Sequence, residues 1–365
     1  MKIAILGTRG IPNNHGGFEQ FAEYLSKQLS DNGHEVFVYN SHLHPYQNTV
    51  WKGVNIIHKK DPEDKIGTAG QFIYDFNCIL DSRKRKFDVL LQLGYTSSSV
   101  WGSLLPKNST IITNMDGLEW KRSKYSKPVR NFLKIAERLA VKSSDFLISD
   151  SIGIKEYLKE KYNIISEFIP YGANLFENPT SEILLDYQVE ISAYNMLIAR
   201  LEPENNIEVI LDGVAMSQSK QKFLVIGKHK TKFGEYLKNK YSPNKNIQFL
   251  GGIYNQNHLN NLRYFANIYF HGHSVGGTNP SLLEAMASNS FIVAHDNIFN
   301  KSILNDDAFF FKNSTDVMQL LGMNKKDFEN KVAANSKKII TRYSWPKIND
   351  DYEQFIQDCL KKKQV

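Results

Sequence analysis

Cysteine is scarce in this sequence, with only Cys78 and Cys359 among 365 residues. The two lie far apart and match neither a disulfide framework nor a metal-binding spacing, so we expect a reducing, cytoplasmic setting. Long apolar runs are also absent. No stretch reaches the roughly 20 residues that a transmembrane helix needs, and residues 1–4 lead into a strand pattern rather than a signal-peptide core. The signatures of nucleic-acid-binding modules are missing too, so no nucleic-acid partner is expected.

Positive charge is in excess, at +7, and it is clustered. The cluster at 120–132 mixes cations with aromatic side chains, Trp120 and Tyr125 among them, as membrane-surface segments do. Two further basic runs, at 83–86 and 361–363, are typical of solvated helix faces. The segment 120–132 therefore predicts contact with an anionic membrane surface, with a solvated helix face as the alternative.

Strand and helix patterns alternate along the whole chain. In the first half, apolar strand cores lie at 3–6, 36–39, 54–57, 89–93, 111–112, 146–148 and 168–169, and helices are expected at 18–29, 70–85, 128–142 and 151–161. In the second half, strand cores lie at 196–199, 223–226, 247–250, 266–270, 291–294 and 309–311, and helices are expected at 207–217, 233–240, 258–266 and 345–363. Because the strands are continuous apolar runs, they favour parallel sheets covered on both faces.

The expected fold class is therefore α/β, with two doubly wound, Rossmann-like domains and a ligand cleft between them. We place the amino-terminal domain at 1–172 and the carboxyl-terminal domain at 187–344, with a connection between. Sheets of this kind bind ligands at the carboxyl ends of their strands, so the motifs that follow strands are the candidates for function.

The segment HGHSVGGTNPSLLEAMA, residues 271–287, follows an apolar strand. It turns through two glycines and enters a helix at Pro280, a residue preformed for a first helical turn, with Thr278 or Asn279 placed to cap. Free backbone N–H groups and the positive end of the helix dipole then predict a phosphate site. Glu284, one turn further, is placed to accept hydrogen bonds from sugar hydroxyls. An ordinary strand-to-helix connection with a solvated glutamate is the alternative.

The loop GTRGIPNNHGGFE, residues 7–19, follows the first strand. It is not the dinucleotide-binding fingerprint, because Arg9 stands where the second glycine should be and the pair Gly16 and Gly17 comes late. A late glycine pair lets the backbone approach a ligand closely. Glu19, in the first helical turn, either caps the helix or orients a hydroxyl, and a long ordered loop with a capping glutamate is the alternative.

Two aspartates and a tyrosine occupy candidate positions in the amino half. Asp116 follows a strand and precedes a glycine, and Asp150 follows the strand core at 146–148. Each is either a carboxylate at the ligand-binding edge of the sheet or a local structural residue, a turn residue for Asp116 and a helix cap for Asp150. Tyr171 lies at the domain junction, from which a phenol reaches the expected cleft.

Two cations end neighbouring strand patterns in the second half. Arg200 suits a diphosphate because a guanidinium forms two hydrogen bonds to it, and Lys228 would add a second charge to neutralise a departing nucleotide diphosphate. A plain loop lysine is the alternative for Lys228. His271 and His273 flank the 271–287 motif, but a His-x-His pair without further ligands is a weak metal signal, and no metal site is expected.

Taken together, these motifs resemble glycosyltransferase family 4, whose members have the GT-B fold of two facing Rossmann-like domains. The likeness rests on GTRGIP and GGFE within 7–19, DGLEW at 116–120, the 271–287 motif and AHDNIFN at 294–300. It is narrowest with a bacterial, rhamnosyltransferase-like subgroup that begins with the GTRGIP…GGFE motif. It extends from Met1 to the start of the last helix.

The resemblance implies a retaining, metal-independent transferase that needs no cofactor and takes its sugar from a nucleotide diphosphate donor. The donor is commonly dTDP-rhamnose, and the acceptor is a lipid-linked glycan in capsule, O-antigen or cell-wall polysaccharide assembly. Such an enzyme works in the cytoplasm, peripheral on the inner face of the cell membrane. The amino-terminal domain takes the acceptor, the carboxyl-terminal domain binds the nucleotide, and the last helix, 345–365, crosses back to the amino-terminal domain.

Residue roles follow from the same resemblance. The donor is expected to contact Gly16, Gly17, Arg200, Ile253, Tyr254, His273, Gly277, Thr278, Asn279 and Glu284, with Ile253 and Tyr254 at the base and Glu284 at the ribose. Catalytic roles fall to Asp116, Asp150, Tyr171, Arg200 and Lys228. Phe18, Glu19 and Trp120 lie on the acceptor side.

Two departures from the family pattern bear on function. Gly276 stands where the wider family has a glutamate, and Asn205 and Asn206 stand where it has a lysine. Loss of that cation weakens stabilisation of the leaving group, and Lys228 is the candidate substitute. The departures keep open a non-catalytic sugar-nucleotide or polysaccharide-binding protein. A nucleotide-sugar dehydrogenase or epimerase is disfavoured by the absent dinucleotide fingerprint.

Overall fold

The computed structural model describes residues 1–14, 16–122 and 124–364. The chain forms two compact units. The amino unit comprises Met1–Trp120, Tyr125–Tyr171 and Trp345–Val365, and the carboxyl unit comprises Lys121–Lys124 and Gly172–Ser344. The chain therefore leaves the amino unit, builds most of the carboxyl unit and returns. Within the carboxyl unit the two connecting segments are hydrogen-bonded, since Ala173 N–H donates to the Tyr343 carbonyl at 2.7 Å.

The amino unit is built on a sheet with the strand order β3-β4-β2-β1-β5-β6-β7-β8. All of its neighbouring strands pair in parallel except β3, which pairs antiparallel with β4. The strand order reverses at β1, which lies between β2 and β5, and such switch points are where these sheets bind ligands. The strands are β1 (Lys2–Leu6), β2 (Glu35–Ser41), β3 (Val50–Trp51), β4 (Val54–Lys59), β5 (Val89–Leu93), β6 (Thr110–Asn114), β7 (Phe146–Ser149) and β8 (Glu167–Phe168).

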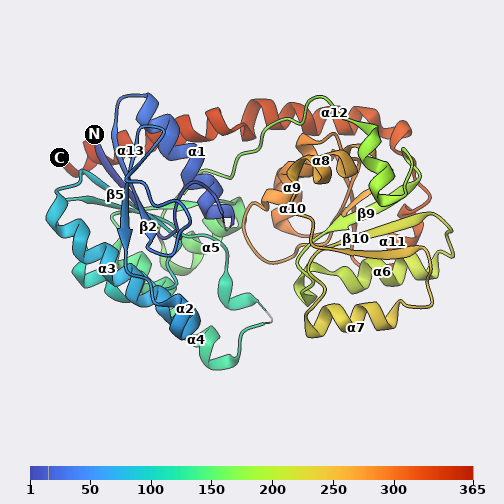
Figure 1. Cartoon of the computed structure of the whole chain (residues 1–365), viewed down its shortest axis with the longest axis horizontal. Coiled ribbons are helices and arrows are strands. Elements are labelled where there is room, and N and C mark those ends of the chain that lie inside the picture. Colours follow the sequence, from blue (N-terminus) through green and yellow to red (C-terminus); the bar gives the residue numbers. More distant parts are fainter. Residues whose placement is uncertain (15, 123, 365) are drawn as a thin grey trace. The chain divides into compact units, whose positions relative to one another are not determined.

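Helices cover this sheet, and the last helix of the chain is one of them (Figure 1). Phe21 packs against Tyr352 with ring centroids 4.7 Å apart, and Tyr24 stacks on Trp345 at 4.5 Å. The helices are α1 (Gly17–Asp31), α2 (Glu63–Ile66), α3 (Gly70–Arg85), α4 (Lys127–Ser143), α5 (Ile152–Tyr162) and α13 (Trp345–Gln364), with 3-10 turns at Gly67–Ala69, Ser99–Leu104 and Glu119–Lys121.

The carboxyl unit has an all-parallel sheet in the order β11-β10-β9-β12-β13-β14. Its order reverses at β9, so the edge after β9 and β12 is the expected ligand position. The strands are β9 (Tyr194–Ile198), β10 (Lys222–Ile226), β11 (Ile247–Gly251), β12 (Tyr269–His271), β13 (Ile292–His295) and β14 (Phe309–Phe311).

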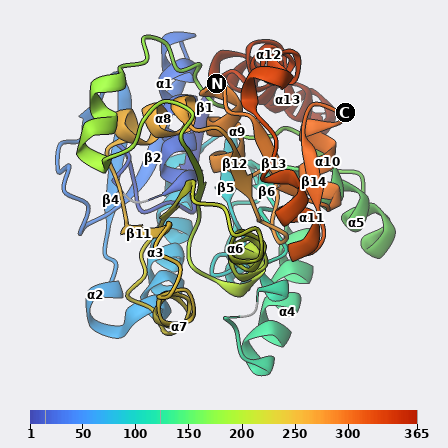
Figure 2. The same cartoon turned by 90° about the vertical axis from the view of Figure 1, so that its right-hand side faces the viewer.

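Helices α6 and α11 lie side by side against this sheet (Figure 2), and their apolar faces enter the main core of the unit. The helical segments of the unit are Ser181–Tyr187 (3-10), Pro203–Asn205 (3-10), α6 (Ile207–Met216), α7 (Lys232–Lys240), α8 (Gln256–Phe265), α9 (Pro280–Ala287), α10 (Ile298–Leu304), α11 (Ser314–Leu320), Lys325–Phe328 (3-10), α12 (Glu329–Lys338) and Ile339–Tyr343 (π).

The expected α/β class with two parallel-sheet, Rossmann-like units is confirmed. Several short elements were not predicted, among them α2, α11 and α12. The start of α11 carried a signal that periodicity overlooks, because Asn313 and Asp316 form a reciprocal capping box. Among the described residues, no helix combines the length and apolarity needed to cross a bilayer.

Candidate functional site

A pocket of about 570 Å³ opens at the carboxyl ends of β9 and β10 and the N-terminus of α9, entirely within the carboxyl unit. Volumes of this order are typical of small-molecule sites. The lining residues are Ile198, Ala199, Arg200, Leu201, Glu202, Ile226, Gly227, Lys228, Thr231, Gly252, Ile253, Tyr254, His273, Asn279, Pro280 and Ser281. The predicted residues Arg200, Lys228, Ile253, Tyr254, His273 and Asn279 therefore lie around one space.

The N-terminus of α9 forms one wall of this pocket. Of the two expected caps, Asn279 takes the position, and its side chain accepts the Ser281 N–H at 2.9 Å. Pro280 is the first helical residue, as expected. Pro280 has no N–H and the Ser281 N–H is bonded to the cap, so this wall favours an anion through the partial positive charge of the helix N-terminus. Gly277 and Thr278 do not line the pocket, and Thr278 is 3% exposed.

The loop after β9 presents Arg200 and is fixed by Asn205 and Asn206. The Asn205 amide donates to the Arg200 carbonyl at 2.7 Å, and the Asn206 amide donates to the Gly272 carbonyl at 2.7 Å. A Cβ at Gly272 would lie 2.0 Å from the Asn205 carbonyl oxygen, so the two segments touch through their backbones. The two asparagines thus hold the loop after β9 against the loop after β12.

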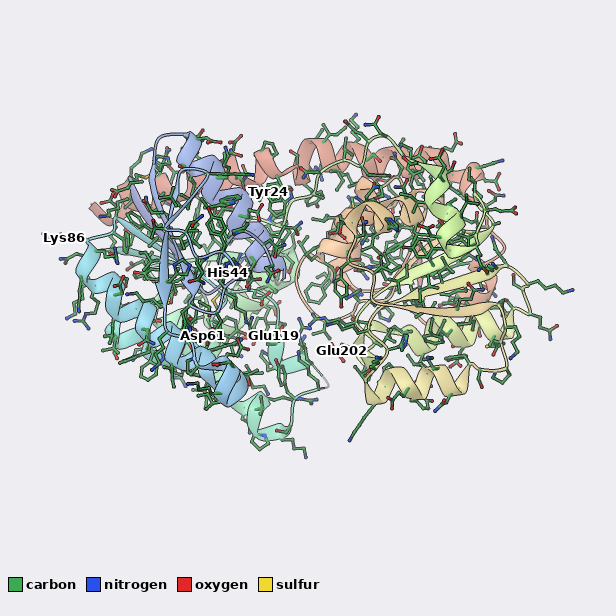
Figure 3. The ribbon with its side chains drawn as sticks, in the orientation of Figure 1. Tyr24, His44, Asp61, Lys86, Glu119 and Glu202 are labelled. Atoms are coloured by element: carbon green, nitrogen blue, oxygen red, sulfur yellow. The ribbon has the colours of Figure 1, made fainter. Side chains whose placement is uncertain are left out.

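Lys228 is the second cation of the pocket. Its ammonium lies 5.6 Å from the centre of the Tyr254 ring, and Tyr254 is 74% exposed. Glu202, labelled in Figure 3, also lines the pocket, so the positive charge is partly balanced. A basic pocket with one exposed aromatic ring is suited to a ligand that carries both phosphate and a planar base.

The two histidines at the end of β12 are neutral. Their rings stack with centroids 4.5 Å apart. Burial, aided by the neighbouring Arg200 charge, lowers the pKa of His273 to about 3, and burial also lowers the pKa of His271 well below its usual value. At neutral pH both are therefore uncharged imidazoles rather than cations. Among the described residues, neither ring nitrogen of His271 has a hydrogen-bond partner.

Glu284, which was expected to accept hydrogen bonds from a sugar, already has a protein partner. Its carboxylate pairs at 2.6 Å with Arg263 of α8, whose side chain is 1% exposed. Glu284 does not line the pocket, but Ser281, one turn earlier on the same face of α9, does. No sequence spacing pointed to Arg263.

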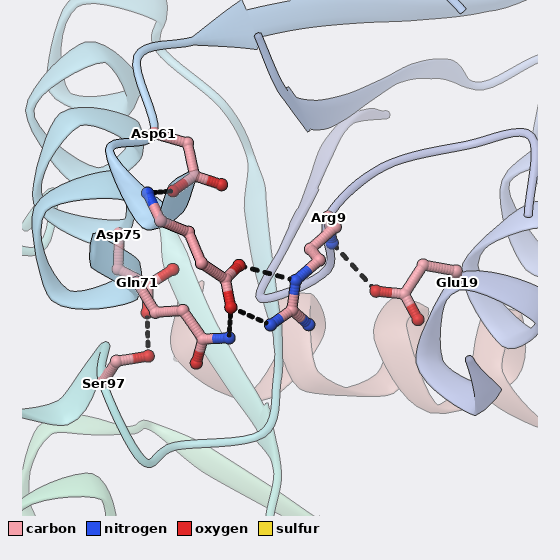
Figure 4. A network of polar contacts seen from close by, with 7 residues as sticks. Arg9, Glu19, Asp61, Gln71, Asp75 and Ser97 are labelled. Atoms are coloured by element: carbon pink, nitrogen blue, oxygen red, sulfur yellow. Dashed lines mark hydrogen bonds and ion pairs between the residues drawn. The ribbon is translucent and has the colours of Figure 1, made fainter. Parts of the chain in front are cut away.

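In the amino unit, side chains hold the loop 7–19 in place. Glu19 accepts the Arg9 N–H at 2.9 Å and is 5% exposed, so it closes the loop, and among the described residues α1 has no side-chain cap, so the capping role predicted for Glu19 is wrong. The Arg9 guanidinium forms a two-bond ion pair with Glu63 at 2.8 and 2.7 Å (Figure 4). Close by, Asp75 accepts a bond from Ser97, and burial raises the pKa of Asp75 to about 7.

The carboxylates predicted at the strand ends gather around Tyr171. Burial raises the pKa of the Tyr171 phenol, and the charges of Asp116 and Asp150 raise it further, so both carboxylates lie within electrostatic reach. Asp116 has φ +51°, a left-handed conformation that aspartate adopts more readily than most residues and that fits the turn alternative. Ser151 rather than Asp150 caps α5, so the capping alternative for Asp150 is wrong. Phe18 packs 6.2 Å from the Tyr171 ring.

Trp120 is held by a buried carboxylate. Its indole N–H donates to Glu137 at 3.0 Å, and Glu137, 1% exposed, also accepts bonds from Tyr157, Tyr162 and Lys161. Trp120 therefore packs into a polar cluster of the amino unit, and this position explains why an aromatic residue occurs within a basic segment. Gly16 and Gly17 also belong to the amino unit, at the start of α1.

Sequence reasoning missed several residues of the pocket, including Thr231, Ser281 and Gly252. Thr231 had a recognisable signal, since its side chain caps α7 by accepting the Gly234 N–H. Within the described ranges, no group of three or more His, Cys, Asp or Glu side chains is placed to hold a metal ion.

Two family models match the chain. Residues 1–174 match the one described as "Domain of unknown function (DUF1972)", and residues 192–332 match the one described as "Glycosyl transferases group 1". The second match contains every lining residue of the pocket. No curated protein shows significant similarity to the chain.

Solved structures match over the whole chain at low identity. Sucrose-phosphate synthase from Thermosynechococcus elongatus is 15% identical with a TM-score of 0.80, and the match covers 99% of each chain. A glycosyltransferase from Rickettsia africae is 17% identical with a TM-score of 0.70 and 99% coverage of each. HepE from Anabaena, in complex with UDP and glucose, is 14% identical with a TM-score of 0.76, covering 98% of this chain and 99% of the other. These likenesses show a shared fold.

Proposed function

We propose that this chain, a glycosyltransferase of the GT-B fold, holds a nucleoside diphosphate sugar in the pocket of its carboxyl unit and transfers the sugar to a glycan acceptor. The observation that carries the proposal is the joining of Arg200, Lys228 and the N-terminus of α9 around one space. Two side-chain cations and a helix N-terminus are the groups that bind a diphosphate. HepE, which has a similar fold, has been solved in complex with UDP and glucose, and this supports the proposal that the present chain binds a nucleotide.

The pocket also suits the chemistry of a departing diphosphate. As the bond between the anomeric carbon and the phosphate oxygen breaks, negative charge grows on the diphosphate, and fixed positive groups stabilise it. The backbone of Arg200 is held by Asn205, and the start of α9 is held by its cap. Lys228 supplies the cation that Asn205 and Asn206 do not.

The remaining steps of this proposal follow the family resemblance. The acceptor hydroxyl forms the new bond on the face that the diphosphate leaves, so the anomeric configuration is retained. Its proton passes to the departing phosphate oxygen, and no metal or cofactor takes part. Asp116 and Asp150 position the acceptor hydroxyl, or one of them takes its proton in place of the phosphate oxygen, and Tyr171 orients the sugar.

The donor and acceptor are proposed on the motifs of the amino half. The resemblance to the rhamnosyltransferase-like subgroup favours dTDP-rhamnose as donor and a lipid-linked glycan of surface polysaccharide, such as capsule or O-antigen, as acceptor. A donor panel of dTDP-rhamnose, UDP-glucose and GDP-mannose, with release of the free nucleoside diphosphate as readout, tests the choice. Release from another donor alone would replace rhamnose in the proposal.

Peripheral binding at the inner membrane surface is part of the proposal, and it rests on α4. This helix exposes Val129 at 39% and Ile135 at 57%, and its basic residues include Lys127, Lys134 and Arg138. Apolar side chains among cations on one exposed helix are typical of interfacial segments. Trp120, by contrast, is engaged with Glu137. Sedimentation with vesicles should increase with anionic lipid content, and sedimentation indifferent to it would count against this part.

The first experiment is thermal unfolding with dTDP, UDP, GDP and NAD, followed by turnover with the sugar form of whichever nucleotide stabilises the protein. A ligand that binds only the folded state raises the unfolding temperature. We expect a rise with one nucleoside diphosphate and release of that diphosphate on turnover. Stabilisation without turnover on any acceptor would favour the non-catalytic binding protein.

A further inference from the structure

A second pocket, of about 330 Å³, lies wholly within the amino unit, between the 3-10 turn Ser99–Leu104 and the end of α4. Its lining combines two apolar side chains, one lysine and three serines, which are Val100, Leu139, Lys142, Ser99, Ser103 and Ser143. None of these residues belongs to the motifs on which the proposed function is based. The nucleotide pocket of the carboxyl unit therefore does not account for this one.

The 3-10 turn and α4 touch at one side of the pocket. A Cβ at Gly102 would lie 2.6 Å from the Cβ of Ser143, so a larger residue would push the turn away from the helix. The Ser143 hydroxyl donates to the Ala140 carbonyl at 3.4 Å, within its own helix. Ser99 is 5% exposed, and among the described residues its hydroxyl has no hydrogen-bond partner. Because buried hydroxyls are usually paired, an unpaired one in the wall points to a ligand.

Lys142 gives the pocket a positive rim. It is exposed and lies in the last turn of α4, and it forms no ion pair with any residue that the structure describes. Asp145, the acidic residue that follows it most closely in sequence, is paired with Lys363 instead. A lysine beside apolar walls suits a ligand that is anionic at one end and apolar at the other.

The pocket continues the exposed face of α4. Ile135, Leu139 and Lys142 follow each other at helical spacings of four and three residues, so they lie on one face. Ile135 is 57% exposed, whereas Leu139 lines the pocket. Part of the surface on which the proposed membrane contact is based therefore leads directly into the pocket.

We propose that this pocket binds one anionic phospholipid, with part of an acyl chain between Val100 and Leu139 and the phosphate at Lys142. The Ser99 hydroxyl then donates to an oxygen of the lipid. A pocket of this volume is at the small end of ligand sites, so it encloses a segment of one chain rather than the whole lipid. This inference rests on the membrane contact within the proposed function and goes beyond it, because it replaces general attraction to an anionic surface by one saturable site.

Calorimetry with short-chain lipids, each below the concentration at which it forms micelles, tests the site without a membrane. The wild type should bind dihexanoyl-phosphatidylglycerol saturably, at one molecule per chain. Glycerophosphoglycerol, the same headgroup without acyl chains, should bind at least about tenfold more weakly, because each methylene that the pocket encloses strengthens binding by up to about fourfold. Dihexanoyl-phosphatidylcholine, whose headgroup has no net charge, should bind about 3- to 10-fold more weakly.

Two variants separate the contributions of charge and shape. Lys142→Met should remove most of the preference for phosphatidylglycerol over phosphatidylcholine. Lys159→Met is the matched control, because it removes another exposed lysine from the last turn of an amino-unit helix, and it should keep the preference. Ser103→Trp introduces a large side chain at an exposed lining position and should weaken binding of both lipids at least about tenfold. If thermal unfolding shows that Ser103→Trp does not fold, Ser103→Leu provides a smaller obstruction.

Three results would overturn the inference: no saturable binding of either lipid, equal affinity for the lipid and its bare headgroup, or wild-type affinity in a folded Ser103→Trp variant. A failure of this inference is distinguishable from a failure of the proposed function. If the wild type sediments with anionic vesicles but does not bind short-chain lipid, only the lipid site is wrong. If it does neither, the proposed membrane contact is wrong as well, while nucleotide binding in the carboxyl unit is tested independently.

Discussion

Replacement of Lys228 by methionine tests whether this lysine supplies the positive charge that the resemblance to glycosyltransferase family 4 leads us to expect near Asn205 and Asn206. Lys228 lines the pocket, and Lys230, two residues further, does not, although both side chains are exposed. Methionine keeps the length of the side chain and removes its charge. Lys230→Met is therefore a matched control for the loss of one positive charge from the same loop.

The expected magnitude follows from Coulomb's law at the surface of a pocket. Two unit charges about 5 Å apart interact by about 3 kcal/mol at an effective dielectric constant of ~20. Because the side chain of Lys228 is exposed, solvent and salt reduce this to about 1–2 kcal/mol. The loss in diphosphate affinity should be about 5- to 30-fold, since 1.4 kcal/mol corresponds to a factor of ten.

Calorimetry with paired ligands locates the effect. Affinity for the nucleoside diphosphate should fall by that factor in Lys228→Met, while affinity for the matching nucleoside, which lacks phosphate, should change less than about threefold. The value of kcat/KM should fall at least as much as diphosphate affinity if the cation also stabilises the leaving group. The reasoning is refuted if nucleoside and diphosphate lose affinity equally, because the loss would then come from the Tyr254 contact, or if Lys230→Met matches Lys228→Met.

Three further predictions concern stability. Gly10→Ala should lower the free energy of unfolding by roughly 2–4 kcal/mol in urea titrations. The reason is that Gly10 has φ +127° and that a Cβ there would lie 2.3 Å from the Asn40 side chain. Gly33 has φ +84° and no atom within 4 Å of such a Cβ, so Gly33→Ala should lower the free energy of unfolding by only about 1–2 kcal/mol. Equal costs for the two would contradict the steric argument. His271 and His273 bind protons less readily when folded, so their contribution to stability should be lost as pH falls below about 6.5 toward 3, by at most about 1.4 kcal/mol per pH unit for each. Hydrogen exchange at β12 from pH 7 to 5 should show that loss of stability. If stability falls as steeply with pH in a His273→Asn variant, His273 does not contribute to the loss. Glu137→Gln should destabilise the amino unit by about 1–3 kcal/mol in fluorescence-monitored unfolding, because four donors share that buried carboxylate. If Glu137→Gln lowers the free energy of unfolding less than Lys161→Met does, the carboxylate is not central to the cluster.

The features that depend on local pattern could be predicted from the sequence. Continuous apolar runs marked the parallel strands, and the strand, glycine turn and proline-led helix of 271–287 marked one wall of the pocket. Arg200 and Lys228 each follow a strand pattern. Because the carboxyl ends of parallel strands share one edge of a sheet, both cations could be predicted to lie at the pocket.

The features that depend on contacts between distant side chains could not be predicted. Arg263 meets Glu284 from a different helix, and nothing in the spacing of the two residues indicates it. Trp120 was assigned to the acceptor side from the family resemblance, and its bond to Glu137, 17 residues away, had no signal in the sequence. Asn205 and Asn206 were treated as a missing charge, and only the coordinates reveal their bonds to the Arg200 and Gly272 carbonyls.

The position of α13 in the chain has a consequence for synthesis on the ribosome. Tyr352 of this helix bonds to Asn114 at 2.8 Å in the interior of the amino unit, and residues 172–344 precede it in the chain. A nascent chain therefore exposes Phe21 and Tyr24, the α1 side chains that contact α13, until the whole carboxyl unit has emerged. The unit that is translated first is the last to be completed, so chains that stall before Trp345 should attract chaperones through their amino unit.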